Sequence, residues 1–196
     1  MTTTSTTHQK SSVQSRVRLK DFNSSGFNRG AGKGKEICWY LFKMMFFLSA
    51  FPFPNGIKIK LLRLFGAKIG SGVTVKPRVN IHFPWKLEVG DDVWIGEEVF
   101  ILNFENTVIG NNVCISQRAF LCGGNHDFKQ PAMPYRNGPI TLLDGAWVGA
   151  SCFVGPGVTI GVDTVVTAGS IVTGNLEGNG IYRGNPAIFV KNRWTN

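Results

Sequence analysis

A six-residue repeat of aliphatic residues runs from residue 69 to about residue 177 and constrains the fold more than any other feature. An aliphatic residue recurs at every sixth position, usually followed by Gly, with a small or β-branched residue four places on. Representative copies are Ile69-Gly-Ser-Gly-Val73, Val89-Gly-Asp-Asp-Val93, Ile109-Gly-Asn-Asn-Val113 and Val154-Gly-Pro-Gly-Val158. The phase slips by two residues after Ile81 and after Ile101, and a long break covers residues 126–139. About fifteen hexads result, which is the signature of a solenoid.

A period of six fits neither an α-helix nor a simple alternating strand. It is typical of short strands separated by turns, with the aliphatic residue pointing inward and Gly supplying unusual backbone angles at the corners. Three hexads form one triangular coil. The repeat therefore predicts a parallel β-helix over residues 69–177, with about five coils stacked about 4.8 Å apart. Each coil covers the apolar edge of the next, so the coils are stable only together.

The chain before the repeat divides into two parts. Residues 1–34 are poor in apolar residues and rich in Ser, Thr, Asn and Gly, without the apolar stretch of a signal peptide, which predicts a disordered basic tail. Residues 35–68 form a predicted helical segment, with one helix over 36–49 and a second over 58–65. Residues 178–196 follow the repeat and form a C-terminal segment.

The basic charge belongs to the N-terminal part. Residues 1–80 contain 14 Lys and Arg against two acidic residues, whereas residues 81–196 contain seven against ten. Such a patch is compatible with an anionic membrane surface, an acidic glycan or nucleic acid, and equally with a solvated tail. Nucleic acid is not expected, because no recognised motif is present and the tail lacks interleaved aromatic residues.

Residues 37–53 are the one apolar stretch long enough to raise the question of a membrane. They reach only the short limit for a bilayer span, and Lys43 lies inside them. We expect an amphipathic helix that covers the core or lies on a membrane surface. The four cysteines show no metal-ligand spacing and no disulfide framework, which fits a reducing cytosol, and Cys152 is predicted to be a buried thiol.

Several stretches of the chain resemble a known family. They are Leu61-Leu-Arg-Leu-Phe-Gly-Ala-Lys-Ile69, Asn125-His-Asp127, Asp144-Gly-Ala-Trp-Val-Gly149, Val154-Gly-Pro-Gly-Val-Thr-Ile-Gly161 and Gly184-Asn-Pro-Ala187. Together they resemble the colanic acid biosynthesis type of sugar O-acetyltransferases, within the hexapeptide-repeat acyltransferases. The resemblance runs from about residue 39 to 193. It implies an all-β fold with a left-handed β-helix, although the usual rule for parallel crossovers would predict a right hand.

The resemblance also implies a function. It points to a homotrimer with active sites between subunits, acetyl-CoA as co-substrate without a metal, and a sugar hydroxyl in exopolysaccharide or surface-glycan synthesis as acceptor. Such an enzyme is expected in the cytoplasm, with the basic helical segment offering a peripheral contact at the inner membrane surface.

The long break in the repeat contains the best candidate for a general base. A neutral hydroxyl needs a base to remove its proton, and histidine suits this at neutral pH. Of the three histidines, only His126 lies in the one long loop; His8 lies in the tail and His82 in an early hexad. A structural His126 is the alternative, but the resemblance places the catalytic histidine here. Asp127 could orient the imidazole, brace the loop or contact the sugar.

The remaining site residues rest on the resemblance. It assigns the oxyanion-stabilising N–H to Ala150, the neighbour of the pantetheine arm to Trp147, and the coenzyme A groove to Gly149, Ala168 and Gly169. It further suggests Asn185 and Pro186 for closing the groove, and Arg183 and Lys191 for its phosphates. Each assignment has a structural alternative. The small groove residues could serve turn geometry, Trp147 could cover a coil edge, and Arg183 and Lys191 could be ordinary surface charges.

Acceptor contacts are expected near the second slip and on the long loop. Asn103 stands where maltose-type relatives carry Asp, so a carboxylate would come from Glu105 or be absent, which argues against maltose-like specificity. Tyr135 and Arg136 are the loop residues expected to touch the sugar.

The sequence disfavours three other functions. A zinc enzyme of the γ-carbonic-anhydrase kind needs three histidines around one metal, but the repeat holds only His82 and His126. A non-catalytic scaffold or membrane-docking module is disfavoured by His126 together with Trp147 and Asn185. A serine-type or other small-molecule acetyltransferase shares the fold but resembles the chain poorly before the repeat.

Overall fold

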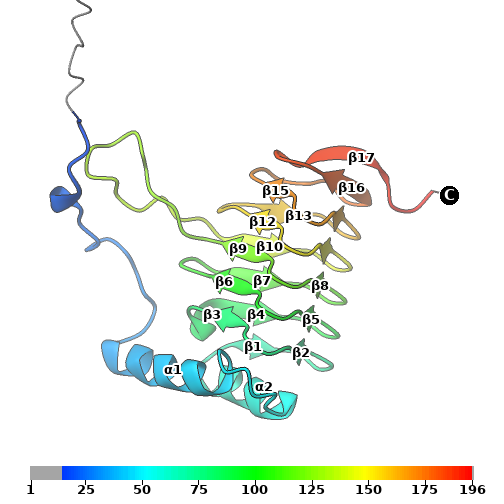
Figure 1. The fold of residues 1–196 in the computed structure, drawn as a ribbon, viewed down its shortest axis with the longest axis horizontal. Coiled ribbons are helices and arrows are strands. Elements are labelled where there is room, and N and C mark those ends of the chain that lie inside the picture. Colours follow the sequence, from blue (N-terminus) through cyan, green and yellow to red (C-terminus); the bar gives the residue numbers. More distant parts are fainter. Residues whose placement is uncertain (1–14, 196) are drawn as a thin grey trace, which may run out of the picture.

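The computed structural model describes residues 15–195. Two helices, α1 (Lys33–Phe46) and α2 (Asn55–Leu64), lie across one end of a three-sided stack of short parallel strands (Figure 1). Short 3-10 turns occur at η1 (Leu19–Asp21) and η2 (Pro84–Lys86). No helix within the described part of the chain is both long and apolar enough to span a bilayer.

Three sheets form the faces of the prism. Face A consists of β1 (Lys68–Ile69), β4 (Leu87–Val89), β7 (Thr107–Ile109), β10 (Ile140–Leu142) and β13 (Thr159–Ile160). Face B consists of β2 (Thr74–Val75), β5 (Trp94–Ile95), β8 (Cys114–Ile115), β11 (Trp147–Val148), β14 (Val165–Val166), β16 (Gly180–Arg183) and β17 (Ile188–Asn192). Face C consists of β3 (Asn80–Ile81), β6 (Phe100–Leu102), β9 (Phe120–Cys122), β12 (Phe153–Val154) and β15 (Ile171–Val172).

The chain visits faces A, B and C in order five times, which confirms the expected five coils. The structure then adds part of a sixth, because β16 pairs with β14 and Leu176 bridges to Ile160. All pairs within the coils are parallel, consistent with the left-handed β-helix that the family resemblance implies. Of the predicted inward residues, Ile69 in the first coil is half-buried. The others are buried along the rest of the axis, and they are Val75, Ile81, Val89, Ile95, Ile101, Ile109, Ile115, Leu121, Leu142, Val148, Val154, Ile160, Val166 and Val172.

The interruptions of the repeat all fall at one edge of the prism. Lys68 pairs with Glu88 and Glu88 with Val108, so the early coils are 20 residues long, whereas Trp147 pairs with Val165 only 18 residues on. The two extra residues lie between faces C and A in both early coils, and the long loop leaves from the same place, between β9 and β10. The slips and the loop are therefore stacked along a single C–A edge.

The hexad glycines have a different role from the one predicted. The glycine after each inward aliphatic residue does not take a positive φ; a Cβ at Gly90 would instead lie 2.8 Å from the Gly110 carbonyl carbon of the next coil. Positive φ occurs further along the turn, at residues such as Asp92 and Asn112 as well as at Gly72. Only some glycines thus serve backbone angles, and the hexad glycine is required because adjacent coils approach closely.

Helices α1 and α2 cover the open end of the first coil. Trp39 is buried and its Nε1 donates to the Ile81 carbonyl at 3.1 Å. The Asn55 side chain accepts from the Val75 N–H and donates to the Val73 carbonyl, which satisfies backbone groups that have no further coil to pair with. The predicted helical segment is confirmed, with both helices beginning three residues earlier than expected.

The part of the N-terminal tail that the structure describes packs on the protein. Residues 15–32, here called the strap, run from the tip of the long loop to the start of α1 (Figure 1). The Arg18 N–H donates to the Pro131 carbonyl at 2.8 Å, and Trp85 Nε1 donates to the Arg29 carbonyl at 2.7 Å. The prediction of a disordered tail is thus not met over these residues, and residues 1–14 lie outside the described part of the chain.

The far end of the prism is closed by an antiparallel strand. β17 pairs with β16, and Arg193 donates to the Gly145 carbonyl at 2.9 Å, which ties the C-terminal segment to the body. All four cysteines are free thiols, and burial raises the pKa of the Cys152 thiol as its inward position predicts.

Candidate functional site

His126 is held in the long loop by a backbone carbonyl. The loop doubles back on itself, with an antiparallel bridge between His126 and Tyr135. Nδ1 of His126 lies 2.6 Å from the Met133 carbonyl oxygen. Because a carbonyl oxygen can only accept, Nδ1 is the donor, and in the neutral imidazole Nε2 is then the basic nitrogen. This is the tautomer that a general base requires.

Asp127 does not orient the imidazole. Its carboxylate accepts from the Gln130 side chain at 2.8 Å and from the Lys129 N–H at 3.1 Å, both within its own turn. The hydrogen bond from Gln130, followed by that from Lys129, lowers the pKa of the Asp127 carboxyl. The contacts of Asp127 support a role in bracing the loop.

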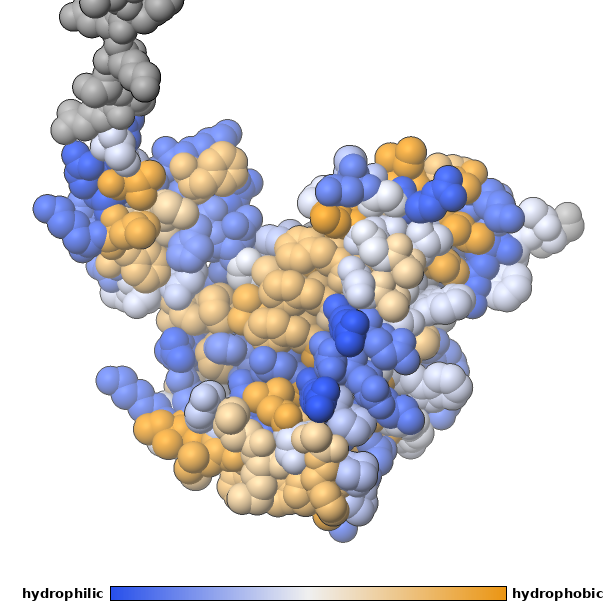
Figure 2. Space-filling model, in the orientation of Figure 1, coloured by the Kyte–Doolittle hydropathy of each residue, from blue (hydrophilic) through white to orange (hydrophobic). Residues whose placement is uncertain are grey.

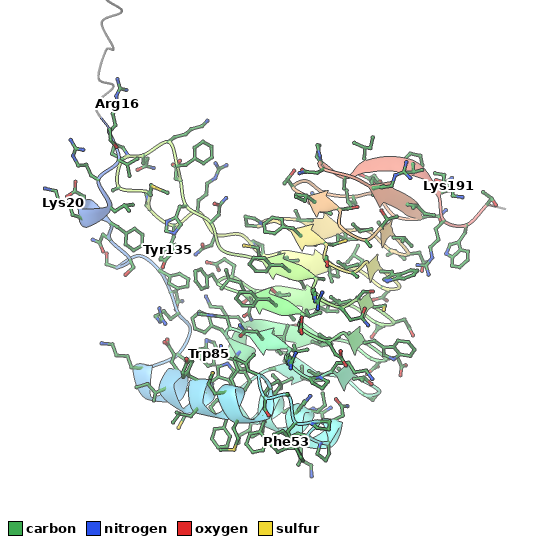
Figure 3. The ribbon with its side chains drawn as sticks, viewed as in Figure 1. Arg16, Lys20, Phe53, Trp85, Tyr135 and Lys191 are labelled. Atoms are coloured by element: carbon green, nitrogen blue, oxygen red, sulfur yellow. The ribbon has the colours of Figure 1, made fainter. Side chains whose placement is uncertain are left out.

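Aromatic rings connect His126 to the strap and to the C–A edge. The Phe22 ring lies edge-on to the His126 ring with centroids 5.6 Å apart, and Tyr135 lies 5.0 Å from His126 on the loop. Phe27 of the strap lies 5.0 Å from both Tyr135 and Phe104. Tyr135 is labelled in Figure 3, where it lies between the loop and the strap. The strap is therefore part of the surroundings of His126.

A hollow of about 260 Å³ opens beside these rings. Its walls are Phe27, Tyr135 and Pro134, and its polar groups come from Glu105, Asn23 and Asn137. Aromatic faces with a carboxylate and amides around them are the groups that bind the C–H faces and hydroxyls of a sugar. The hollow brings together two predicted acceptor residues, Glu105 and Tyr135, with two amides that the sequence did not single out.

Asn103 is not available to an acceptor, and its assignment as a sugar-binding residue is wrong. It is fully buried, and its amide accepts from the Phe83 N–H at 2.8 Å and donates to the Phe83 carbonyl at 2.6 Å. The side chain thus replaces a coil-to-coil backbone pair at the slip. A slip leaves such backbone groups unpaired, and an inward amide satisfies both of them.

Arg136 lies apart from the hollow. It is exposed and lines a separate groove of about 660 Å³ on the face C side of the loop, with Phe128 and Phe153. Neighbouring residues of an extended segment point to opposite sides, so Tyr135 and Arg136 cannot serve the same pocket. Arg136 is therefore not in the acceptor hollow of its own chain.

The residues assigned to coenzyme A form a column at another edge. Ala150, Ala168, Gly169, Asn185 and Pro186 all follow face B strands, at the turn toward face C, in three successive layers. The Gly169 N–H donates to the Ala150 carbonyl at 2.8 Å, which stacks one turn on the next. Among residues 15–195 the Ala150 N–H has no acceptor. We call this set the B–C column; its small residues leave backbone open to a ligand.

Trp147, Gly149, Arg183 and Lys191 flank the B–C column in different ways. Trp147 is 46% exposed on face B and its Nε1 donates to Ser116 Oγ at 2.9 Å. Gly149 is buried, and a Cβ there would lie 2.6 Å from the Ala168 nitrogen, so coil packing explains it. Arg183 ends β16 and Lys191 lies on β17, both exposed at the far end of the prism, where Figure 3 labels Lys191.

One chain does not bring the base and the B–C column together. The loop with His126 leaves at the C–A edge, whereas the column lies at the B–C edge, and face C separates them. The outer side of face C carries a ladder of rings, with Phe100 and Phe120 stacked at 4.8 Å. Within one chain, His126 and Ala150 therefore belong to different edges of the prism.

His82 is a structural residue. Burial, followed by the nearby Lys43 and Arg29 charges, lowers its pKa to about 4. Its ring lies 5.1 Å from Phe104, and it borders a small cavity that also contains Glu36. No group of three His, Cys, Asp or Glu side chains suited to a metal ion occurs between residues 15 and 195.

Sequence reasoning missed the strap and Met133. Phe22 and Phe27 stand out in a tail of Ser, Asn and Gly, and isolated aromatic residues in such a segment were a signal that it packs on something. Met133 acts through its backbone carbonyl, for which its side chain gives no sequence signal.

Known proteins share sequence and fold with this chain. No family model matches the chain. It is 38% identical to the colanic acid biosynthesis acetyltransferase WcaF of Escherichia coli K12 over 174 residues, covering 86% of this chain and 96% of that protein. It is 28% identical to the galactoside O-acetyltransferase of E. coli K12 over 136 residues, covering 67% of this chain and 66% of that one.

Two solved structures share the fold. The hexapeptide-repeat acetyltransferase VCA0836 of Vibrio cholerae, complexed with acetyl coenzyme A, superposes with a TM-score of 0.75 at 22% identity, covering 91% of this chain and 98% of that one. A galactoside acetyltransferase in complex with coenzyme A gives 0.72 at 22% identity, covering 81% and 80%. With its stacked parallel coils and its similarity to WcaF over 86% of its length, the chain belongs to the hexapeptide-repeat family of acetyltransferases.

Proposed function

We propose that the protein transfers an acetyl group from acetyl-CoA to a hydroxyl of a sugar during synthesis of an exopolysaccharide or surface glycan. The observation that carries this proposal is the hydrogen bond from His126 Nδ1 to the Met133 carbonyl, which leaves Nε2 as a base. The His126 ring lies 5.0 Å from Tyr135, which lines the aromatic hollow with Glu105. The similarity to WcaF supports the class of acceptor.

His126 acts twice in this reaction. Nε2 takes the proton of the sugar hydroxyl as its oxygen forms a bond to the thioester carbonyl carbon. The carbonyl oxygen gains negative charge, and the Ala150 N–H, which has no acceptor within residues 15–195, donates to it. The carbon–sulfur bond then breaks, the carbonyl re-forms, and the imidazolium returns its proton to the departing thiolate. The Met133 carbonyl stabilises the imidazolium in between.

The co-substrate is expected along the B–C column. Its extended arm runs past Ala150 and Ala168 toward Asn185, with Trp147 beside it and the exposed Arg183 and Lys191 near the phosphates. Face C separates this column from His126 within one chain, so we propose a homotrimer in which the loop of one subunit reaches the column of the next.

The acceptor sugar occupies the hollow between loop and strap. Phe27 and Tyr135 provide flat apolar faces, and Glu105 with Asn23 and Asn137 accepts from and donates to its hydroxyls. We place the enzyme in the cytoplasm, working at the inner membrane surface where a lipid-linked glycan is within reach.

The catalytic assignment is tested with His126→Gln. The glutamine keeps a hydrogen-bonding side chain in the loop but cannot take a proton, so turnover should fall by about two to four orders of magnitude. Lys129→Gln, on the same loop and exposed, is the matched control and should keep the wild-type rate. Release of free thiol from acetyl-CoA with a glycan panel measures both. A near-normal rate for His126→Gln would refute the role of the imidazole.

The shared site is tested by mixing two inactive chains. Ala168→Trp blocks the B–C column, whereas His126→Gln removes the base. Random mixed trimers of the two variants restore about one quarter of the sites, because one site in four pairs an intact loop with an intact column. Activity should therefore return on co-refolding or co-expression. If the mixture stays inactive while both variants assemble with each other, the site lies within one chain.

A further inference from the structure

Helix α1 is apolar on the side that faces solvent. Trp39 on its inner side is buried and bonded to the first coil, and Phe47, directly after the helix, is buried as well. On the outer side, Ile37, Leu41 and Met45 are 62%, 61% and 58% exposed. These residues follow one another at intervals of four, so they form a single stripe along the helix. Burial in the protein core does not account for this stripe.

The apolar surface continues over α2 and the segment before it. Leu64 is 74% exposed, and Ile57 on the same side of α2 and Phe51 between the helices are also exposed. Figure 2 shows hydrophobic side chains gathered over the α1 and α2 end of the molecule. We call these residues the end patch, and they are Ile37, Leu41, Met44, Met45, Phe51, Ile57 and Leu64.

A lysine extends the exposed apolar side of each helix. Lys33 is exposed one helical turn before Ile37, and Lys60 is exposed between Ile57 and Leu64 on α2. The one acidic residue in these two helices, Glu36, is paired with Arg29 at 2.6 Å, and this pairing lowers the pKa of its carboxyl. The end patch is thus an apolar surface bordered by positive charge.

We propose that the end patch docks the enzyme on an anionic lipid surface. The exposed side chains of α1 and α2 enter the headgroup region with the helices lying flat, while Lys33 and Lys60 meet the lipid phosphates. The long lysine stems keep the ammonium groups at the interface as the apolar residues sink. A second copy of the patch is a poorer occupant, because a two-fold contact would bring like charges together.

Geometry reinforces this docking, and this step rests on the proposed trimer. Rotation about an axis parallel to the solenoids leaves every α1–α2 end on the same side of the assembly. Three end patches would then meet one lipid surface at once, and linked contacts bind far more tightly than single ones.

Docking also sets the height of the long loop above the lipid. The loop leaves from the third coil, which lies about 10 to 15 Å along the prism axis from the first coil at the strand spacing of a sheet.

The test is co-sedimentation of the full-length protein with vesicles. Phosphatidylcholine vesicles with and without about 30% phosphatidylglycerol are compared, at about 0.05 M and about 0.5 M NaCl. We expect binding to the anionic vesicles at low salt, weakened about tenfold by high salt and by removal of the anionic lipid.

Two paired variants separate the contributions. Leu41→Asp with Met45→Asp should reduce binding to both kinds of vesicle at least tenfold, and Lys33→Glu with Lys60→Glu should reduce binding to anionic vesicles at least tenfold. Val162→Asp, exposed in the turn after face A, and Lys20→Glu, exposed on the strap, are the matched controls and should bind within about twofold of wild type. Acetyl transfer to a soluble acceptor should be unchanged in all four, so the docking result is independent of the proposed reaction.

Three results would overturn the proposal. The wild-type protein could stay in the supernatant with anionic vesicles at low salt, or the aspartate pair could still bind. Alternatively, light scattering could show that the aspartate pair changes the size of the assembly, which would make the end patch a contact between copies.

Discussion

The close approach of successive coils can be tested by adding one methyl group. Gly90→Ala would place a Cβ 2.5 Å from Asn111 Oδ1 and 2.8 Å from the Gly110 carbonyl carbon, whereas ordinary contacts begin near 3.4 Å. The backbone atoms cannot withdraw, because the Gly90 N–H donates to the Ile109 carbonyl at 2.8 Å and fixes the spacing of the coils. The coils would have to separate by about half an ångström, which strains this hydrogen bond and that from Asp91 to Asn111.

The expected cost follows from these contacts. Overpacking costs about 1 to 3 kcal/mol and a weakened hydrogen bond about 1 kcal/mol, so Gly90→Ala should destabilise the protein by about 2 to 4 kcal/mol. Gly157→Ala is a matched variant with a positive φ of 79° and no atom within 4 Å, and should cost about 1 kcal/mol. Gly174→Ala has neither constraint and should be neutral or stabilising by up to about 1 kcal/mol.

Thermal melts at one fixed protein concentration measure the series. A change of 1 kcal/mol shifts the Tm by about 2 to 4 °C for a chain of this size. Gly90→Ala should therefore melt about 5 to 15 °C below wild type, Gly157→Ala about 2 to 4 °C below, and Gly174→Ala at or above it. If Gly90→Ala has the same Tm as Gly174→Ala, the close approach of successive coils is not the reason for glycine at this position of the hexad.

Three further outcomes are expected. The pKa of His82 in the folded protein, about 4, lies below the unfolded value near 6.5, so the unfolded chain takes up the proton first as the pH drops. The free energy of unfolding should therefore fall between about pH 6.5 and pH 4, by about 1 to 2 kcal/mol at pH 5. Urea titrations should show this pH dependence in the wild type and lose it in His82→Phe. Lys43 is buried, and burial lowers the pKa of its ammonium group. No oxygen among residues 15–195 accepts a hydrogen bond from it, so Lys43→Met should raise the Tm by a few degrees. A lower Tm would contradict this. Asn103→Leu should lower the free energy of unfolding by about 2 to 4 kcal/mol, because it leaves the Phe83 backbone unpaired. Glu105→Gln should raise the KM for the acceptor without changing the Tm. If Asn103→Leu instead raised the KM and kept the Tm, Asn103 would belong to the sugar site.

The repeat predicted the architecture because its physical cause is local. Whether an aliphatic residue points inward is decided within its own coil by its place in the hexad. The inward positions from Val75 to Val172 could therefore be predicted from the sequence alone. The slips were visible as well, although their alignment at the C–A edge required the coils to be superposed. The glycines were assigned a wrong cause, since contacts between residues such as Gly90 and Gly110 belong to two coils at once.

The site was predictable in its residue types and less so in its contacts. His126 stands out as the one histidine in the one long loop, but its orienting group is the Met133 carbonyl, which depends on how the loop returns. Asn103 is polar and lies at a slip, which is equally the pattern of a ligand contact and of a buried amide that pairs with Phe83. Whether such a residue faces inward is decided by the register of the turn, which the sequence does not specify.

Both ends of the prism are closed, α1 and α2 over the first coil and the antiparallel β17 beyond the last. A parallel stack with bare ends would present unpaired strand edges to other molecules and could grow into a fibre. The terminators fix the number of layers in the molecule. A prism with more layers would therefore require whole coils inserted between these two terminating elements.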